Sequence, residues 1–260
     1  MDLVLYQTVL YAACLVNFLL ALLLLFNNYD YRKYDIYHRS CKITAINYIN
    51  FAIGFFIHGY FTLRFQNPAA ASALSVSHFH VGATMFSWSH TPLMCPNYLT
   101  RKIMVRDFSI MGVGIITYWL PVIVPALAPY SEWPFAIFFL HGVYLSYMFL
   151  SNYYKTQNSI EQSAVEGNAP SWWTPETKRR LLSKHHSFIT GCVLIVIFGL
   201  GSIAITAAFP DKIWPYTLLS GGGMLVFWFL YYAVSEYGGV IEVATYAMQL
   251  NKLDGSRGRK

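Results

Sequence analysis

Five histidines in apolar stretches are the residues of this sequence best suited to chemistry. His78, His80 and His90 fall within SHFHVGATMFSWSHT (77–91), while His58 and His141 lie in two other apolar stretches. Imidazole suits a transition-metal or haem site, and its protonation near neutral pH suits proton sensing. A buried histidine can equally hydrogen-bond across helices and serve packing alone. Whether these histidines bind a metal or haem, sense protons or only pack depends on the secondary-structure elements that position them.

The stretches around the histidines are long enough to cross a membrane. The chain has 260 residues, of which 56% are hydrophobic and 12% charged, whereas soluble domains carry about 25% charged residues. Runs of about 18 or more apolar residues indicate membrane-spanning helices. We therefore expect an all-α polytopic membrane protein, a seven-transmembrane-helix bundle. The expected spans are 3–26, 43–64, 72–92, 107–128, 133–153, 186–209 and 213–236.

The basic residues predict how the bundle is oriented. All of the 18 Lys and Arg residues except Arg64 and Lys212 fall on one side of the expected spans. The positive-inside rule puts that side in the cytoplasm and the N-terminus outside, so we expect a multi-pass protein of the inner (plasma) membrane. Because this asymmetry accounts for the net charge of +6, we expect no nucleic acid to be bound here. Residues 1–236 form the expected transmembrane domain, and 237–260 a cytoplasmic connector helix and flexible tail.

Polar residues recur every three or four positions in several expected spans, which places them on one face of a helix. Because polar groups are costly in lipid, such faces usually point into the bundle. We therefore expect four spans each to carry a line of polar or aromatic residues, called a seam here, that faces a small interior cavity. The seams are Ser77, His80, Thr84, Ser87 and Thr91; Asn47, Asn50, Gly54 and His58; His141, Tyr144, Met148 and Ser151; and, more loosely, Thr217, Ser220, Met224, Trp228, Tyr231 and Ser235.

Counting inward from the outer ends of the spans places three histidines at a similar depth. His58 lies about 9 Å deep, and His80 and His141 lie about 12 Å deep. His78 points about 200° away from His80 around the same helix, and His90 lies near the inner boundary. Only one histidine of the 77–91 stretch can therefore join the outer cluster.

A ligand site is expected where these seams meet, in the outer half of the bundle. Its ligand would be a small apolar molecule, a lipid or a proton. If a metal ion or haem binds instead, His58, His80 and His141 are the expected ligands. No carboxylate is expected at their level, and Glu236, at the inner end of the last span, is the only acid expected within a span. The residues expected to line the site are His58, His80, Thr84, Trp119, His141, Tyr144, Met224 and Trp228.

This chain lacks the residues that define two well-known classes of seven-helix membrane protein. A retinal protein needs a lysine within its last helix, and none occurs between Lys212 and Lys252. Receptors coupled to G proteins carry a D-R-Y-type triplet after the third span, where this chain has LTRKIMVRD (99–107). Their N-P-x-x-Y signature is also missing from the last span. The likeness to both classes is in helix number only.

Four segments resemble the seven-helix sensor region of bacterial membrane-integrated regulators, which precedes a histidine-kinase or helix-turn-helix output domain. They are NNYDYRKYDIYHR (27–39), SWSHTPLMCPNYLTRK (87–102), TKRRLLSKHHSFI (177–189) and the helix expected after Gly238–Gly239. The resemblance implies sensing or signal transduction without catalysis. The 260 residues hold no such output domain, so either one lies beyond them or the chain signals through a cytoplasmic partner protein.

Two other functions compete with sensing. A haem- or metal-binding membrane redox protein would use the same histidines. A small-solute transporter would need helices broken at mid-membrane, for which Pro121, Pro125 and the Gly221–Gly223 run are the available support. The sequence leaves both alternatives open.

Overall fold

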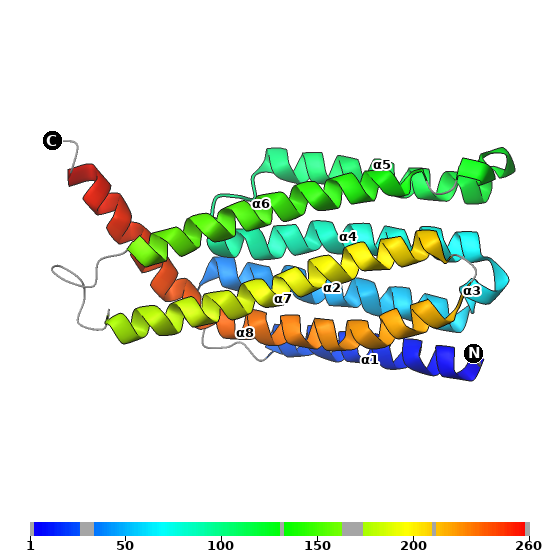
Figure 1. Ribbon diagram of the computed structural model, residues 1–260, viewed down its shortest axis with the longest axis horizontal. Helices are drawn as coiled ribbons and strands as arrows, with labels where there is room; N and C mark the ends of the chain where they lie inside the picture. The colour runs from blue at the N-terminus through cyan, green and yellow to red at the C-terminus, as the bar shows by residue number, and fades with distance from the viewer. Residues whose placement is uncertain (1–2, 27–33, 131–132, 163–173, 210–211, 258–260) are drawn as a thin grey trace.

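The chain folds into a bundle of long helices (Figure 1). A computed structural model describes all residues except 1–2, 27–33, 131–132, 163–173, 210–211 and 258–260. Every regular element in the described part is a helix, which confirms the all-α prediction. The elements are α1 (Leu3–Phe26), α2 (Asp35–Tyr60), α3 (Leu63–Gln66), α4 (Pro68–Met94), α5 (Arg101–Ile123), the 3₁₀ helix η1 (Pro125–Tyr130), α6 (Phe135–Gln162), α7 (Pro175–Ala208) and α8 (Trp214–Arg257).

Six of these helices are long and apolar enough to cross a membrane. They are α1, α2, α5, α6, α7 over Pro175–Thr206 and α8 over Trp214–Ile241. Apolar helices of this length suit the bilayer because every backbone polar group is satisfied within the helix. Their number indicates a multi-pass membrane protein.

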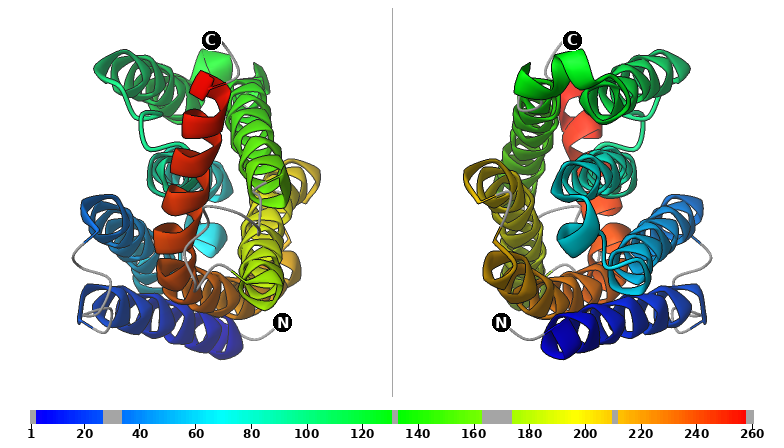
Figure 2. Two further views of the ribbon diagram at one scale, coloured as in Figure 1. Left: turned by 90° about the vertical axis from the view of Figure 1, so that its left-hand side faces the viewer. Right: turned by 90° about the vertical axis from the view of Figure 1, so that its right-hand side faces the viewer.

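The central helix α4 is as long as its neighbours but more polar. It contacts α2, α5, α6 and α7 and lies inside the ring that the other helices form (Figure 2). Its start is fixed by Asn67, whose side chain accepts a hydrogen bond from the Ala70 amide, and by Pro68 in the first turn. Because other helices cover α4, its side chains do not need to be compatible with lipid.

The polar seam predicted for 77–91 faces the bundle interior. Its members are all buried in α4: Ser77, His80, Thr84, Ser87 and Thr91. Helical periodicity alone placed them on one face, and the surrounding helices bury that face. This prediction is confirmed.

Several predicted span limits are shifted. α1 coincides with the predicted 3–26. α2 runs from Asp35 to Tyr60 instead of 43–64, and the chain turns after it at Thr62, whose φ is 48°. α5 begins at Arg101 instead of 107, because the Thr100 hydroxyl accepts a hydrogen bond from the Ile103 amide and caps the helix. The earlier start of α5 moves Asp107 from the predicted boundary into the helix.

Helix α8 is unbroken over 44 residues, which corresponds to about 66 Å. It continues through Gly221–Gly223 and Gly238–Gly239, so the glycine run does not interrupt it. The predicted boundary at 237 lies within this helix, and the predicted tail residues 258–260 lie outside the described part. Beyond the bundle, the C-terminal part of α8 tilts across its end towards α6 (Figures 1 and 2).

Candidate functional site

A chain of buried polar side chains joins α4, α5 and α6. His80 Nε2 lies 2.9 Å from His141 Nδ1, and His80 Nδ1 lies 2.8 Å from the Tyr118 hydroxyl. His80 and His141 are 0% and 4% exposed. Gly114 of α5 makes this close approach possible, because a Cβ at that position would lie 2.7 Å from Tyr118 Oη and 2.8 Å from the His80 ring.

Asp107 extends this chain and corrects the prediction that no carboxylate shares the level of the histidines. It is 0% exposed, and its Oδ1 lies 3.6 Å from His141 Nε2. Arg106 donates to the same oxygen from Nε and Nη2 at 2.8 and 2.6 Å, and Trp88 Nε1 donates to Oδ2 at 2.9 Å. At 3.6 Å the contact with His141 is electrostatic rather than a hydrogen bond.

The polar chain has one consistent direction of hydrogen bonding. The negative charge of Asp107 favours a hydrogen on His141 Nε2 across the 3.6 Å contact, and His141 Nδ1 then accepts from His80 Nε2. Tyr118 donates its hydroxyl hydrogen to His80 Nδ1. The facing nitrogens of the two histidines are thus occupied by each other. Among the described residues no group of three or more His, Cys, Asp or Glu side chains is arranged to hold a metal ion.

His58 lies apart from the His80–His141 pair. Its Nε2 is 3.0 Å from the Ser75 hydroxyl, and it borders a separate cavity with Tyr6, Arg64 and Tyr216. The Arg64 guanidinium stacks over the Tyr216 ring at 3.6 Å from its centroid. The structure therefore brings together two of the three histidines that the sequence placed at a similar depth.

The other predicted site residues are dispersed. The Thr84 hydroxyl donates to the His80 carbonyl within α4, and Trp119 Nε1 donates to the Ser77 hydroxyl. The Tyr144 hydroxyl accepts from Arg106 Nη1 on the outside of the polar chain. Met224 is half-buried, and Trp228 is 58% exposed on α8 and faces away from the interior. The structure does not gather these residues around one ligand.

The loop between α4 and α5 packs against α4 through Tyr98. The Tyr98 hydroxyl lies 3.1 Å from the Ser87 hydroxyl, and the ring is buried. Burial raises the pKa of the Tyr98 hydroxyl above its ordinary value. Tyr98 therefore remains a neutral hydrogen-bonding partner of α4.

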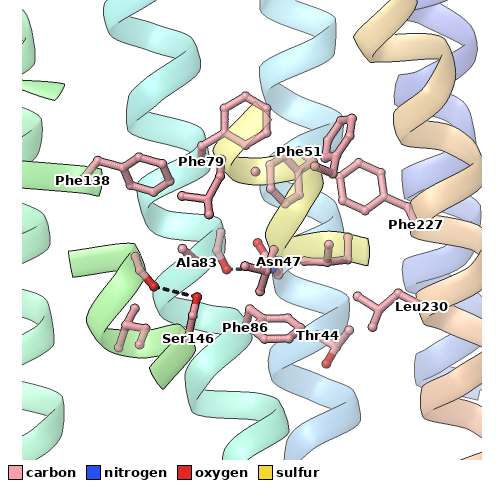
Figure 3. Close-up of a pocket in the computed structure, with 18 of the residues that line it drawn as sticks. Thr44, Asn47, Phe51, Phe79, Ala83, Phe86, Phe138, Ser146, Phe227 and Leu230 are labelled. Atoms are coloured by element: carbon pink, nitrogen blue, oxygen red, sulfur yellow. Dashed lines mark hydrogen bonds between the residues drawn. The ribbon is translucent and has the colours of Figure 1, made fainter. Parts of the chain in front are cut away.

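An apolar cavity lies between α2, α4, α6, α7 and α8 (Figure 3). It has about 740 Å³ of space not filled by atoms, including space open to the outside. Six phenylalanines dominate its wall, and none of the described residues that line it carries a charge. The phenylalanines are Phe51, Phe79, Phe86, Phe138, Phe198 and Phe227.

Asn47 is the distinctive polar group of this wall. Its side chain is 8% exposed, and Nδ2 donates to the Gly82 carbonyl at 3.1 Å. Its Oδ1 has no hydrogen-bond partner among the described residues. In Figure 3 the Asn47 side chain lies between Phe51 and Phe86 and faces the cavity. An unpaired buried acceptor costs about 1–3 kcal/mol, so a donor group that reached this atom would offset that cost.

Glycines shape the cavity in two opposite ways. A Cβ at Gly82 would lie 2.5 Å from the Phe51 ring, so this glycine permits the close contact of α4 with α2. At Gly142 and Gly199 a Cβ would meet no described atom beyond its own helix within 4 Å. These two glycines line the cavity and leave part of it open.

Sequence reasoning placed Asn47 on an inward-facing seam but did not include it among the site residues. The signal was present, because Asn47, Asn50, Gly54 and His58 follow helical spacing. The phenylalanines gave no such signal, since apolar residues on a membrane helix fit a lipid-facing and a cavity-facing position equally well.

Comparison with models of protein families gives no match, and neither does comparison with curated proteins or with solved structures.

Proposed function

We propose that this protein is a membrane-embedded sensor that binds a small apolar molecule in the cavity between α2, α4, α6, α7 and α8. The observation that carries the proposal is an apolar cavity with one unpaired acceptor, Asn47 Oδ1, in its wall. Ligand sites are typically apolar clefts with a few placed polar groups. The resemblance to sensor regions of bacterial membrane-integrated regulators supports the same function.

The proposed protein lies in the inner membrane of a bacterial cell and crosses it seven times, with α4 as the third span. Its N-terminus is outside the cell and its C-terminus is in the cytoplasm. The central position of α4 supports its assignment as a span, because its polar seam is covered by other helices. The distribution of the basic residues supports the orientation.

Helix α8 is the proposed route from the cavity to the cytoplasm. Phe227 and Leu230 of α8 line the cavity, and the same helix continues past its apolar span to Arg257. The Tyr48 hydroxyl of α2 donates to the Phe227 carbonyl at 2.9 Å, and the Phe51 and Phe227 rings are 4.9 Å apart. A ligand that binds one arrangement of these contacts better than another shifts the position of α8. A cytoplasmic output domain or partner protein would read this shift.

Filling the cavity tests the proposal. We expect native mass spectrometry of the purified protein in nanodiscs to detect a small molecule that co-purifies or is taken up from a membrane lipid extract. A Cβ at Gly199 would meet no described atom beyond its own helix within 4 Å, so Gly199→Leu should extend into the cavity and abolish this binding. Gly112→Leu on α5 is the matched control, because a Cβ at Gly112 is equally unobstructed and does not line the cavity.

Transmission to the cytoplasmic side is measured by hydrogen exchange over residues 242–257. We expect the bound molecule to change amide exchange there in the wild type and in Gly112→Leu but not in Gly199→Leu. Equal binding to Gly199→Leu would overturn the cavity as the site. Binding without any change over 242–257 would overturn the signalling role.

A further inference from the structure

We propose that the ligand is an uncharged, largely apolar molecule with one hydroxyl or N–H group that donates a hydrogen bond to Asn47 Oδ1. This inference rests on the proposed function and names the chemistry of its ligand.

The wall of the cavity excludes a charged ligand. The described residues of the wall come from five helices, and none of them is Lys, Arg, Asp or Glu. A carboxylate or ammonium group placed there would lose its hydration without gaining a counter-charge, which is strongly unfavourable. The ligand must therefore be neutral in the bound state.

The hydroxyl groups of the wall have already committed their hydrogens. Thr44 donates to the Ser40 carbonyl at 2.9 Å, and Ser146 donates to the Gly142 carbonyl at 2.7 Å. Tyr48 donates to the Phe227 carbonyl. A carbonyl, ether or ester on a ligand would have to compete with these bonds. The wall is therefore poor in available donors.

Asn47 provides the complementary acceptor. Its Nδ2 donates one of its two hydrogens to the Gly82 carbonyl, which orients the amide, and Oδ1 has no hydrogen-bond partner among the described residues. A ligand without a donor would leave Oδ1 buried and unpaired. A site built around such an acceptor discriminates against analogues that lack the donor, because the unpaired group remains after they bind.

The phenylalanines fix where the apolar part of the ligand lies. The rings of Phe51, Phe79, Phe198 and Phe227 contact one another in sequence, with centroid distances of 5.7 Å for Phe51–Phe79, 6.1 Å for Phe79–Phe198, 5.7 Å for Phe198–Phe227 and 4.9 Å for Phe51–Phe227. Asn47 lies near Phe51 of this group (Figure 3). A ligand whose apolar body packs on these rings can direct its donor at Oδ1.

Indole and benzofuran provide a matched pair of probes. They have nearly the same shape, but indole carries an N–H donor where benzofuran has an oxygen. Binding to the protein in nanodiscs is measured by titration calorimetry, with Gly199→Leu nanodiscs as the reference that subtracts partition into lipid. We expect indole to bind about tenfold more tightly than benzofuran, as the loss of one hydrogen bond predicts, and indole-3-acetate to show no cavity-dependent binding.

A variant at Asn47 separates the hydrogen bond from shape. Asn47→Leu removes the acceptor with little change in size, so indole and benzofuran should bind it equally, and benzofuran should bind it at least as well as it binds the wild type. Retained benzofuran binding shows that the variant is folded. If it does not fold, the comparison of the two probes in the wild type still decides the proposal.

The outcomes separate the two proposals. Equal binding of both probes to the wild type, blocked by Gly199→Leu, would overturn the donor requirement and leave the cavity as a ligand site. Tighter binding of benzofuran than of indole would also overturn the donor requirement. Cavity-dependent binding of indole-3-acetate would overturn the requirement for an uncharged ligand, and either result would leave the cavity as a ligand site. Absence of any difference between wild type and Gly199→Leu for all three probes would overturn both proposals.

Discussion

His80 of α4 and His141 of α6 share a buried hydrogen bond, with 2.9 Å between Nε2 of the first ring and Nδ1 of the second. Tyr118 and Asp107 of α5 lie at the two ends of this pair. Three helices are thus held together by four polar side chains in the apolar interior. This network sets the positions of α4 and α6, which both line the adjacent cavity.

The direction of hydrogen bonding predicts the tautomers of both histidines. The Asp107 carboxylate faces His141 Nε2 at one end, and the Tyr118 hydroxyl can donate to His80 Nδ1 at the other, so both rings should carry their hydrogen on Nε2. Nitrogen-15 NMR of histidine-labelled protein distinguishes a protonated from an unprotonated ring nitrogen. A spectrum in which either buried ring carries its hydrogen on Nδ1 would contradict this arrangement.

Replacing His141 should weaken the bundle. His141→Phe keeps an aromatic ring but leaves His80 Nε2 without its acceptor and removes the ring nitrogen that faces Asp107. We expect a loss of about 1–2 kcal/mol in the free energy of unfolding, measured by denaturant titration in detergent micelles. His186→Phe is the control, because His186 is exposed on α7 and should leave stability nearly unchanged. Equal stability of the two variants would show that the pair does not hold the helices together.

Asp107 should tolerate an amide better than an apolar residue. Asp107→Asn retains an oxygen for Trp88 Nε1, whereas Asp107→Leu leaves both Trp88 and Arg106 without their acceptor. We expect Asp107→Leu to cost about 1–3 kcal/mol of unfolding free energy and Asp107→Asn to cost less. Denaturant titration gives the stabilities, and the indole N–H resonance of Trp88 reports whether its hydrogen bond persists. The prediction fails if the two variants are equally stable.

The contact of α2 with α4 should depend on Gly82. Gly82→Ala would place a methyl group 2.5 Å from the Phe51 ring, so the helices or the ring must shift, at a cost of about 1–3 kcal/mol. Gly112→Ala is the matched control, because its Cβ meets no described atom within 4 Å and alanine is the better helix former. Thermal unfolding should rank Gly112→Ala at or above wild type and Gly82→Ala below it. The reverse order would contradict the tight α2–α4 contact.

The proposed topology predicts opposite accessibility for the two ends of α4. Gln66 and Asn97 are both exposed and flank this helix. In intact cells a membrane-impermeant maleimide should label Gln66→Cys, and it should label Asn97→Cys only after the membrane is opened. Wild-type protein, with its four native cysteines, gives the background. Labelling of both positions from the same side would show that α4 does not span the membrane.

The sequence determines the helices and the facing of the polar seam on α4. Apolar runs specify helices where backbone groups must be satisfied without water, and a spacing of three or four residues specifies a shared face. For that reason α1 and the buried seam of α4 follow from the sequence. The same spacing is a weaker guide on α8, where Phe227 faces the cavity while the adjacent Trp228 is exposed.

Only the tertiary structure decides which residues meet. Periodicity does not fix the axial offset between helices or which neighbour each face contacts. The start of α5 at Arg101 places Asp107 within reach of His141, and the packing of α4 brings His80 to His141 while His58 contacts Ser75. The cavity likewise results from the joint packing of five helices, in which glycines leave space and Asn47 Oδ1 has no partner among the described residues. Composition and spacing thus specify the helices, and close packing between distant segments specifies the site.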